Sequence, residues 1–147
     1  MAAEDLIRIA EENLNAFNTG DWERFRATLT SDCLYEELAT QRRIEGPDEI
    51  LAVNQGWKRA FPDARGTLNS AVASGNTVVQ EITWTGTNTG PMDMPTGAMP
   101  ATGRPVTIRA AMVNTFEGER IKESHHYFDL MGMMEQLGMT TQQRRAA

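Results

Sequence analysis

The sequence is poor in cysteine, in positive charge and in long hydrophobic runs, and each shortage excludes a class of protein. Its single cysteine, Cys33, rules out an internal disulfide and any metal site built from several cysteines. Since no activating base lies near Cys33 in the sequence, we expect a buried small side chain rather than a catalytic thiol. No apolar run approaches the ~20 residues that a membrane-spanning helix needs.

The charge balance is acidic, with 14 Lys and Arg against 20 Asp and Glu and a formal net charge of -6. This balance argues against nucleic acid or an anionic membrane surface as the main partner. The N-terminal stretch "MAAEDLIRIAEENL" is acidic and amphipathic, unlike a signal peptide. We therefore expect a soluble, cytoplasmic protein whose 147 residues form one domain, 1–147, around a single core.

The first part of the chain predicts helices. Apolar side chains recur every three or four positions up to Phe17, and Gly20 can end that helix as a C-terminal cap. Asp21 caps a second short helix that reaches Leu29. Pro47 suits the first turn of a third helix, and short strands are expected between the second and third helices.

Strand patterns dominate from residue 64 onward, and a short helix closes the chain. Alternating apolar residues predict four strands. The segment 90–105 holds three Gly and four Pro, so we expect an irregular loop that borders a pocket mouth. Helices followed by strands indicate an α+β fold, in which a curved, mostly antiparallel sheet and three N-terminal helices enclose a pocket.

The hairpin at 106–129 contains an unusually polar stretch, "SHHYFD". A two-residue turn at 117–118 would place His125, Tyr127 and Asp129 on the buried face beside Met112. Acidic and imidazole groups are costly there unless they are paired, and proteins most often accept that cost where the groups do chemistry. A one-residue bulge would reverse the assignment and turn His126 inward instead.

Each of these residues also has an ordinary structural interpretation. Asp129 can be the N-cap of the closing helix, His125 a hydrogen-bonded wall residue and Tyr127 part of the core. His126 is expected at the surface or at an interface. His125 and Asp129 lie ~13 Å apart along one strand, so they cannot form a hydrogen-bonded dyad.

Several short motifs resemble one family when they are taken in order over nearly the whole chain. They are "FNTGDWERFRATLTSD", "AFPDARGTL", "WTGTNTG", "PATGRPVTIRA", "GERIKESHHYFD" and "MMEQLG". The chain resembles the SnoaL-like polyketide cyclases, or ester cyclases, of the nuclear transport factor two superfamily. The resemblance implies a cone-shaped α+β barrel around a deep pocket, and homodimers or homotetramers that associate through the outer sheet face.

The resemblance also implies an activity, the cofactor-free intramolecular aldol ring closure of a polyketide-type ester. Asp129 matches the aspartate regarded as the general acid/base of these cyclases. His125 and Tyr127 are then candidates to bind carbonyl oxygens, while Tyr35 and Trp57 are candidates to stack on a small hydrophobic or aromatic substrate. No metal or organic cofactor is expected, because the neighbouring histidines alternate between strand faces.

The sequence departs from the common pattern of the family in three places, one of which is Ser124-His125 in place of a frequent His-Trp pair. The other two, Glu81 and Asn88, enter the candidate pocket with Met112. Glu81 stands where many members have Arg, and Asn88 stands where many have His. If Glu81 faces Asp129, two carboxylates with different pKa values would favour an epoxide hydrolase or an isomerase.

The third alternative is a non-catalytic protein that binds a small ligand, since fold alone does not fix function. One carboxylate among aromatic residues favours cyclisation, and none favours binding. The loop residues Met92, Met94 and Met99 either contact a ligand or fold onto the core.

Overall fold

The computed structural model describes residues 2–139. The elements follow in the order α1 (Ala3–Thr19), α2 (Trp22–Ala27), β1 (Leu29–Glu37), β2 (Arg42–Glu45), α3 (Pro47–Ala60), β3 (Arg65–Ser74), β4 (Thr77–Thr87), β5 (Met92–Met94), β6 (Gly97–Met99), β7 (Pro105–Glu117), β8 (Arg120–Phe128) and α4 (Leu130–Gln136). The structure confirms the expected α+β class and the short closing helix, but only α1 and α2 precede the sheet, because β1 and β2 come before α3.

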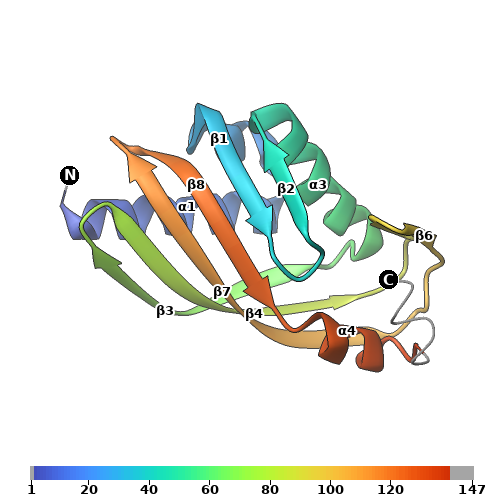
Figure 1. Ribbon diagram of the computed structural model, residues 1–147. Helices are drawn as coiled ribbons and strands as arrows, with labels where there is room; N and C mark the ends of the chain where they lie inside the picture. The colour runs from blue at the N-terminus through green and yellow to red at the C-terminus, as the bar shows by residue number, and fades with distance from the viewer. Residues whose placement is uncertain (1, 140–147) are drawn as a thin grey trace.

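Six strands form one curved sheet in the order β2-β1-β8-β7-β4-β3. The β1–β8 pair is parallel and the other pairs are antiparallel. The long strands β3, β4 and β7 curve beneath the helices, α3 stands beside β1 and β2, and α4 lies at the opposite end from the N-terminus (Figure 1). This curvature leaves space between the helices and the concave face.

Local sequence explains where the helices begin and end. Gly20 adopts the left-handed conformation, with φ of 70°, and its N–H donates to carbonyl oxygens of the last turn of α1. The Asp21 carboxylate accepts the Arg24 N–H at 3.1 Å and so caps α2. The prediction that this helix reaches Leu29 is wrong, because Leu29 is the first residue of β1.

The face assignment of the last hairpin is also wrong, and a bulge is the reason. Glu117 pairs with Arg120 and Phe116 with Ile121, but Thr115 then pairs with Glu123, so Lys122 is an extra residue on β8. One extra residue exchanges the two faces of a strand beyond it. From residue 123 onward the even-numbered side chains of β8 therefore turn inward, as the alternative register predicted.

The segment at 90–105 is more regular than its Gly and Pro content indicated. Met92 pairs with Met99 and Met94 with Gly97, which makes β5 and β6 a small hairpin. Met92 and Met94 are almost wholly buried in a cluster with Met133 of α4. Burial of these side chains orders the short strands, and it confirms that Met92 and Met94 fold onto the core.

Two apolar clusters hold the domain together, one between the N-terminal helices and the sheet and one around α4 and the β5–β6 hairpin. Cys33 is buried in the first, as expected, and burial raises the pKa of its thiol. Within residues 2–139 no helix is both long and apolar enough to cross a membrane.

Candidate active site

A cavity lies where the two apolar clusters meet, between the helices and the concave face of the sheet. Its volume is about 110 Å³. This is several times the ~10–15 Å³ that one water needs, so an organic ligand can enter. Most of the lining is aromatic or aliphatic, and Phe17, Phe61, Ile82 and Met133 are examples.

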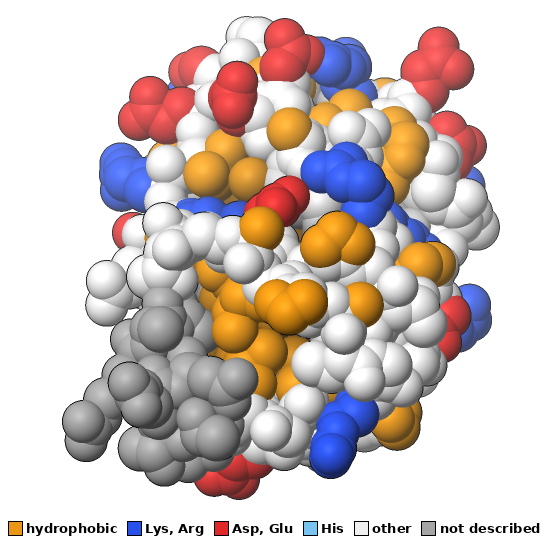
Figure 2. Space-filling view, turned by 90° about the vertical axis from the view of Figure 1, so that its right-hand side faces the viewer, with side chains coloured by type: hydrophobic (Ala, Val, Ile, Leu, Met, Phe, Trp, Pro, Cys, Tyr) orange, Lys and Arg blue, Asp and Glu red, His pale blue; other side chains and the backbone are white. Residues whose placement is uncertain are grey.

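Hydrophobic side chains also gather on the face formed by the end of α3, the β5–β6 hairpin and α4 (Figure 2). Phe61 and Met133 bring this end of the molecule into the cavity wall. The cavity therefore favours apolar ligands, and its few polar groups decide which chemistry is available.

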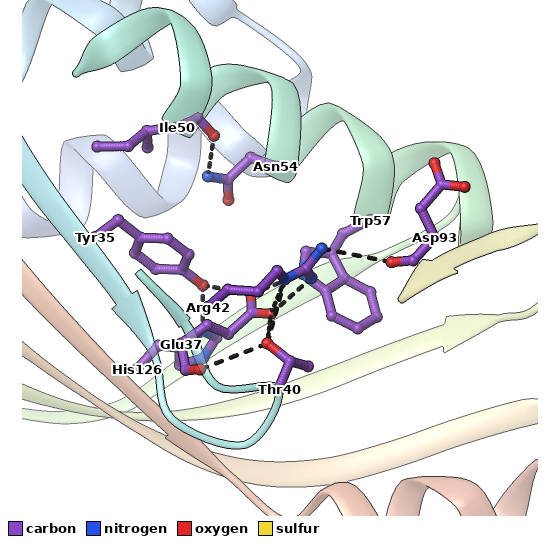
Figure 3. A network of polar contacts seen from close by, with 9 residues as sticks. All are labelled: Tyr35, Glu37, Thr40, Arg42, Ile50, Asn54, Trp57, Asp93 and His126. Atoms are coloured by element: carbon purple, nitrogen blue, oxygen red, sulfur yellow. Dashed lines mark hydrogen bonds and ion pairs between the residues drawn. The ribbon is translucent and has the colours of Figure 1, made fainter. Parts of the chain in front are cut away.

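The main polar group of the site is the carboxylate of Glu37, which lies behind the cavity wall and has no solvent exposure. Its Oε1 accepts from Thr40 Oγ1 at 2.6 Å and from Arg42 Nη2 at 2.7 Å. Its Oε2 accepts from Tyr35 Oη and from Trp57 Nε1, each at 2.8 Å (Figure 3). These donors come from both sides of the β1–β2 turn and from α3.

Burial raises the pKa of Glu37, whereas the Arg42 charge and the Thr40 hydrogen bond lower it, and the net result is a pKa below the usual value. Glu37 is therefore an anion. Burial raises the pKa of Tyr35 well above its usual value, and the neighbouring negative charge of Glu37 adds to the effect. Tyr35 is accordingly a neutral phenol that donates to Glu37.

His126 connects this network to the cavity. Trp84 Nε1 can only donate, and it lies 3.2 Å from His126 Nε2, so that nitrogen accepts. The neutral ring then carries its proton on Nδ1 and donates it to Tyr35 Oη at 2.9 Å. Burial lowers the pKa of His126 to about 4 although the charge of Glu37 opposes the shift, so the imidazole is neutral near pH 7.

A second polar group on the cavity wall is Gln80 of β4. Its Oε1 accepts from Asn114 Nδ2 at 3.1 Å, and Asn114 Oδ1 accepts from Ser124 Oγ at 2.6 Å. Gln80, Met112 and His126 are successive partners across β4, β7 and β8. The sheet wall of the cavity therefore has two polar positions, Gln80 and His126, with the Met112 side chain between them.

Three of the sequence-predicted residues contribute to the lining of the cavity. Tyr35, Trp57 and Met112 all line the cavity, on β1, α3 and β7. Tyr35 and Trp57 are also bound into the Glu37 network, which fixes their orientation. The structure therefore places these three aromatic or flexible side chains where a substrate could contact them.

Three others lie on the outer face of the sheet. Glu81 is exposed and contacts Ser70 and Arg109. His125 contacts Glu123 at 3.0 Å, and Tyr127 is 45% exposed. The prediction that Glu81, His125 and Tyr127 face the pocket is therefore incorrect. For the two β8 residues, His125 and Tyr127, the bulge at residue 122 is the reason.

Asn88 and Asp129 have structural partners instead of cavity contacts. Asn88 is fully buried; its side chain donates to the carbonyl of Ala60 at 3.2 Å and accepts from the Thr102 N–H at 2.9 Å. It thereby ties the end of α3 to the loop before β7. Asp129 is exposed and accepts the Gly132 N–H at 2.9 Å as the N-cap of α4. Its inward orientation was predicted wrongly.

Sequence reasoning missed His126, Gln80, Trp84 and Glu37. For His126 the sequence offered one indication, the alternative register with a one-residue bulge, because that register turns His126 inward. The other three required the sheet order, because strands far apart in the chain bring Gln80 and Trp84 to the cavity wall and Glu37 behind it. Within the part of the chain that the structure describes, no three His, Cys, Asp or Glu side chains gather closely enough to hold a metal ion.

Comparisons with known proteins agree with this fold. The family model for SnoaL-like polyketide cyclases matches residues 7–137. The fold is similar to that of a SnoaL-like polyketide cyclase candidate from Jannaschia sp. CCS1, with a TM-score of 0.84, 18% identity and 94% of each chain covered. No curated protein matches the chain.

Two further solved structures share the fold. IdmH, a polyketide cyclase candidate from Streptomyces antibioticus, has a TM-score of 0.77 and 24% identity over 91% of this chain and 99% of its own. An LEH-like epoxide hydrolase of M. tuberculosis has a TM-score of 0.71 and 21% identity over 92% of this chain and 90% of its own.

Replacing Glu37 with Gln should lower the free energy of unfolding by about 3–5 kcal/mol, because it removes the fully buried anion and leaves the partly buried Arg42 without its partner. Glu36→Gln is the matched control, since the adjacent side chain makes only long, partly exposed contacts with Arg43 and His125, and its replacement should cost less than about 1 kcal/mol. Urea unfolding of both variants measures the difference. Equal losses for the two variants would contradict the assigned network.

Stability should depend on the titration of His126. Its pKa in the folded protein, about 4, lies below the ordinary 6.5, so the unfolded chain binds the proton first as the pH falls. The stability due to neutral His126 is complete above pH 6.5 and is lost as the pH falls toward 4. Between pH 7 and 4.5 we expect a loss of about 2–3 kcal/mol from this residue.

The measurement is the free energy of unfolding in urea at a series of pH values, for wild type and for His126→Gln. The difference between the two curves isolates His126 from the carboxylates that both proteins share. An unchanged pH dependence in His126→Gln would show that the imidazole is not held neutral by burial.

Proposed function

Because the chain belongs to the SnoaL-like polyketide cyclase family, we propose that it closes a ring in a polyketide-type ester by a cofactor-free intramolecular aldol reaction. The observation that carries this proposal is a neutral His126 on the wall of an apolar cavity, linked through Tyr35 to the Glu37 anion. The family match and the structural neighbours support a broader class of function, that of a cyclase, an isomerase or an epoxide hydrolase.

A histidine with a pKa of about 4 is a weak base, and this restricts the substrate. General-base catalysis is efficient when the base and the carbon acid are not too far apart in strength. A C–H group between two carbonyls is already acidified by the substrate itself, whereas an isolated ketone is not. The weak base therefore supports a polyketide-type substrate, which carries 1,3-dicarbonyl units.

In the proposed reaction the substrate displaces the Trp84 indole from His126 Nε2, and that nitrogen takes the proton from the acidic carbon. The resulting carbanion attacks the second carbonyl, and the alkoxide that forms takes the same proton back from the imidazolium. The Glu37 charge favours the imidazolium through Tyr35, while the apolar cavity folds the chain so that the two carbons meet.

The role of Asp129 as general acid/base stays a prediction from the family resemblance. Its contact with the Gly132 N–H and its exposure favour His126 as the group that meets the substrate. Asn is also a good N-cap, so Asp129→Asn removes the carboxylate without removing the cap. This variant therefore separates the two assignments.

A second candidate is the binding of a small apolar ligand without catalysis. It is favoured by the lining of the cavity, which contains no Asp or Glu among the residues that the structure describes. Hydrolysis of epoxides through a carboxylate pair has less support, because Glu81 is turned to the outer face.

The test is turnover of a panel of polyketide methyl esters and epoxides by wild type, His126→Gln and Asp129→Asn, with His125→Asn as the matched control. We expect ring closure to fall by at least ~10²-fold in His126→Gln, the usual range for loss of an acid/base group, and to change only a few-fold in the other two. Circular dichroism and the unfolding midpoint verify folding.

The other outcomes each select an alternative. Loss of turnover in Asp129→Asn alone would return the acid/base role to that residue. Diol formation would identify an epoxide hydrolase, and ligand binding without turnover of any panel member would leave the binding protein ahead.

We also propose that the protein forms a homodimer or homotetramer through the outer sheet face. Val72, Val79 and Val113 are successive partners across β3, β4 and β7, and Val72 is 64% exposed. Such an apolar row is typical of a surface that a second copy covers. We expect multi-angle light scattering to give a dimer or tetramer mass for wild type and a smaller mass for Val113→Lys; a monomeric wild type would refute the proposal.

A further inference from the structure

The amide nitrogen of Gln80 is a buried donor without a partner. Gln80 is only 2% exposed, and its Oε1 is occupied by Asn114 Nδ2. Of the buried side-chain nitrogen and oxygen atoms within residues 2–139, Gln80 Nε2 alone has no hydrogen bond. Buried donors are almost always paired in native proteins, so this exception requires an explanation.

The surroundings of Gln80 hold the free N–H in place. Ser124 Oγ donates to Asn114 Oδ1, which leaves Asn114 Nδ2 to donate to Gln80 Oε1. This chain of two hydrogen bonds, from β8 through β7 to β4, fixes one end of the amide. Because Gln80 lines the cavity, its other end is presented to whatever occupies that space.

The position of Gln80 relative to His126 defines the shape of that occupant. The two residues stand two strands apart, with Met112 between them in the same row. Neighbouring strands are ~4.8 Å apart, so their Cα atoms are separated by about 10 Å. A flat ligand that lies over Met112 can therefore place one oxygen near His126 and another near Gln80.

We propose that Gln80 is a specificity-determining residue, whose Nε2–H donates to a ketone oxygen of a flat, aromatic or polycyclic ligand. The proposal rests on the proposed function in that it describes the same cavity, and it names the class of compound and the end of the molecule that is recognised. A hydrocarbon of the same shape leaves the donor unpaired and loses that hydrogen bond.

The experiment compares three rigid compounds that share one skeleton: 9-fluorenone, a ketone; 9-fluorenol, an alcohol; and fluorene, which has no oxygen. Trp57 and Trp84 line the cavity, so quenching of tryptophan fluorescence reports binding. The variant is Gln80→Met, which keeps the length and removes the amide. Thr83→Val is the matched control, a polar-to-apolar change three residues along β4 and on the opposite face.

Wild type should bind 9-fluorenone at least ~10-fold more tightly than fluorene, which corresponds to about 1.4 kcal/mol. Gln80→Met should reduce this ratio at least ~5-fold and leave the affinity for fluorene within ~2-fold, whereas Thr83→Val should keep the wild-type ratio. A ratio that survives in Gln80→Met would assign ketone recognition to Tyr35 or His126 and overturn the proposal.

Two other results would also overturn it. If wild type does not prefer the ketone, or binds none of the three compounds, Gln80 does not recognise flat ketones. If it prefers 9-fluorenol, and Gln80→Met abolishes that preference, the amide presents its oxygen and not its N–H. None of the three probes can undergo ring closure, so these affinity ratios test the role of Gln80 independently of the proposed cyclase activity.

Discussion

The buried anion of Glu37 is the constraint on which the candidate site depends. A carboxylate without solvent exposure is costly unless donors surround it, and here Tyr35, Thr40, Arg42 and Trp57 all donate. Those donors come from β1, the β1–β2 turn, β2 and α3. One charge therefore fixes the end of the sheet against a helix and orients two side chains of the cavity wall.

The charge of Glu37 also influences the chemistry of the cavity wall indirectly, through Tyr35. Tyr35 directs its proton to Glu37, so the tyrosine oxygen accepts the Nδ1 proton of His126, and the Nε2 lone pair is left on the other side of the ring. Apolar walls keep that imidazole neutral. The described lining of the cavity contains no carboxylate, but the Glu37 anion lies directly behind it and is hydrogen-bonded to the lining residue Tyr35.

Much of the architecture was predictable, because it follows from local patterns. The apolar stripe that ends at Gly20, the Pro47 start of α3 and the alternation in the later strands each predict their element without tertiary information. The N-cap role of Asp129 was also foreseeable, since Asp before a helix is common. Two errors, the end of α2 and the β5–β6 hairpin, arose where long-range packing decided between short alternatives.

The sequence by itself determined the order of helices and strands and the α+β class, because periodicity and caps act over a few residues. Only the tertiary structure decided which of two adjacent histidines faces the cavity. Lys122 adds one residue to β8, and the two-residue period of a strand then exchanges His125 for His126. Likewise, Glu37 and Gln80 are ordinary polar residues in sequence. They acquire their roles only when the strand order places Gln80 on the cavity wall and Glu37 behind it.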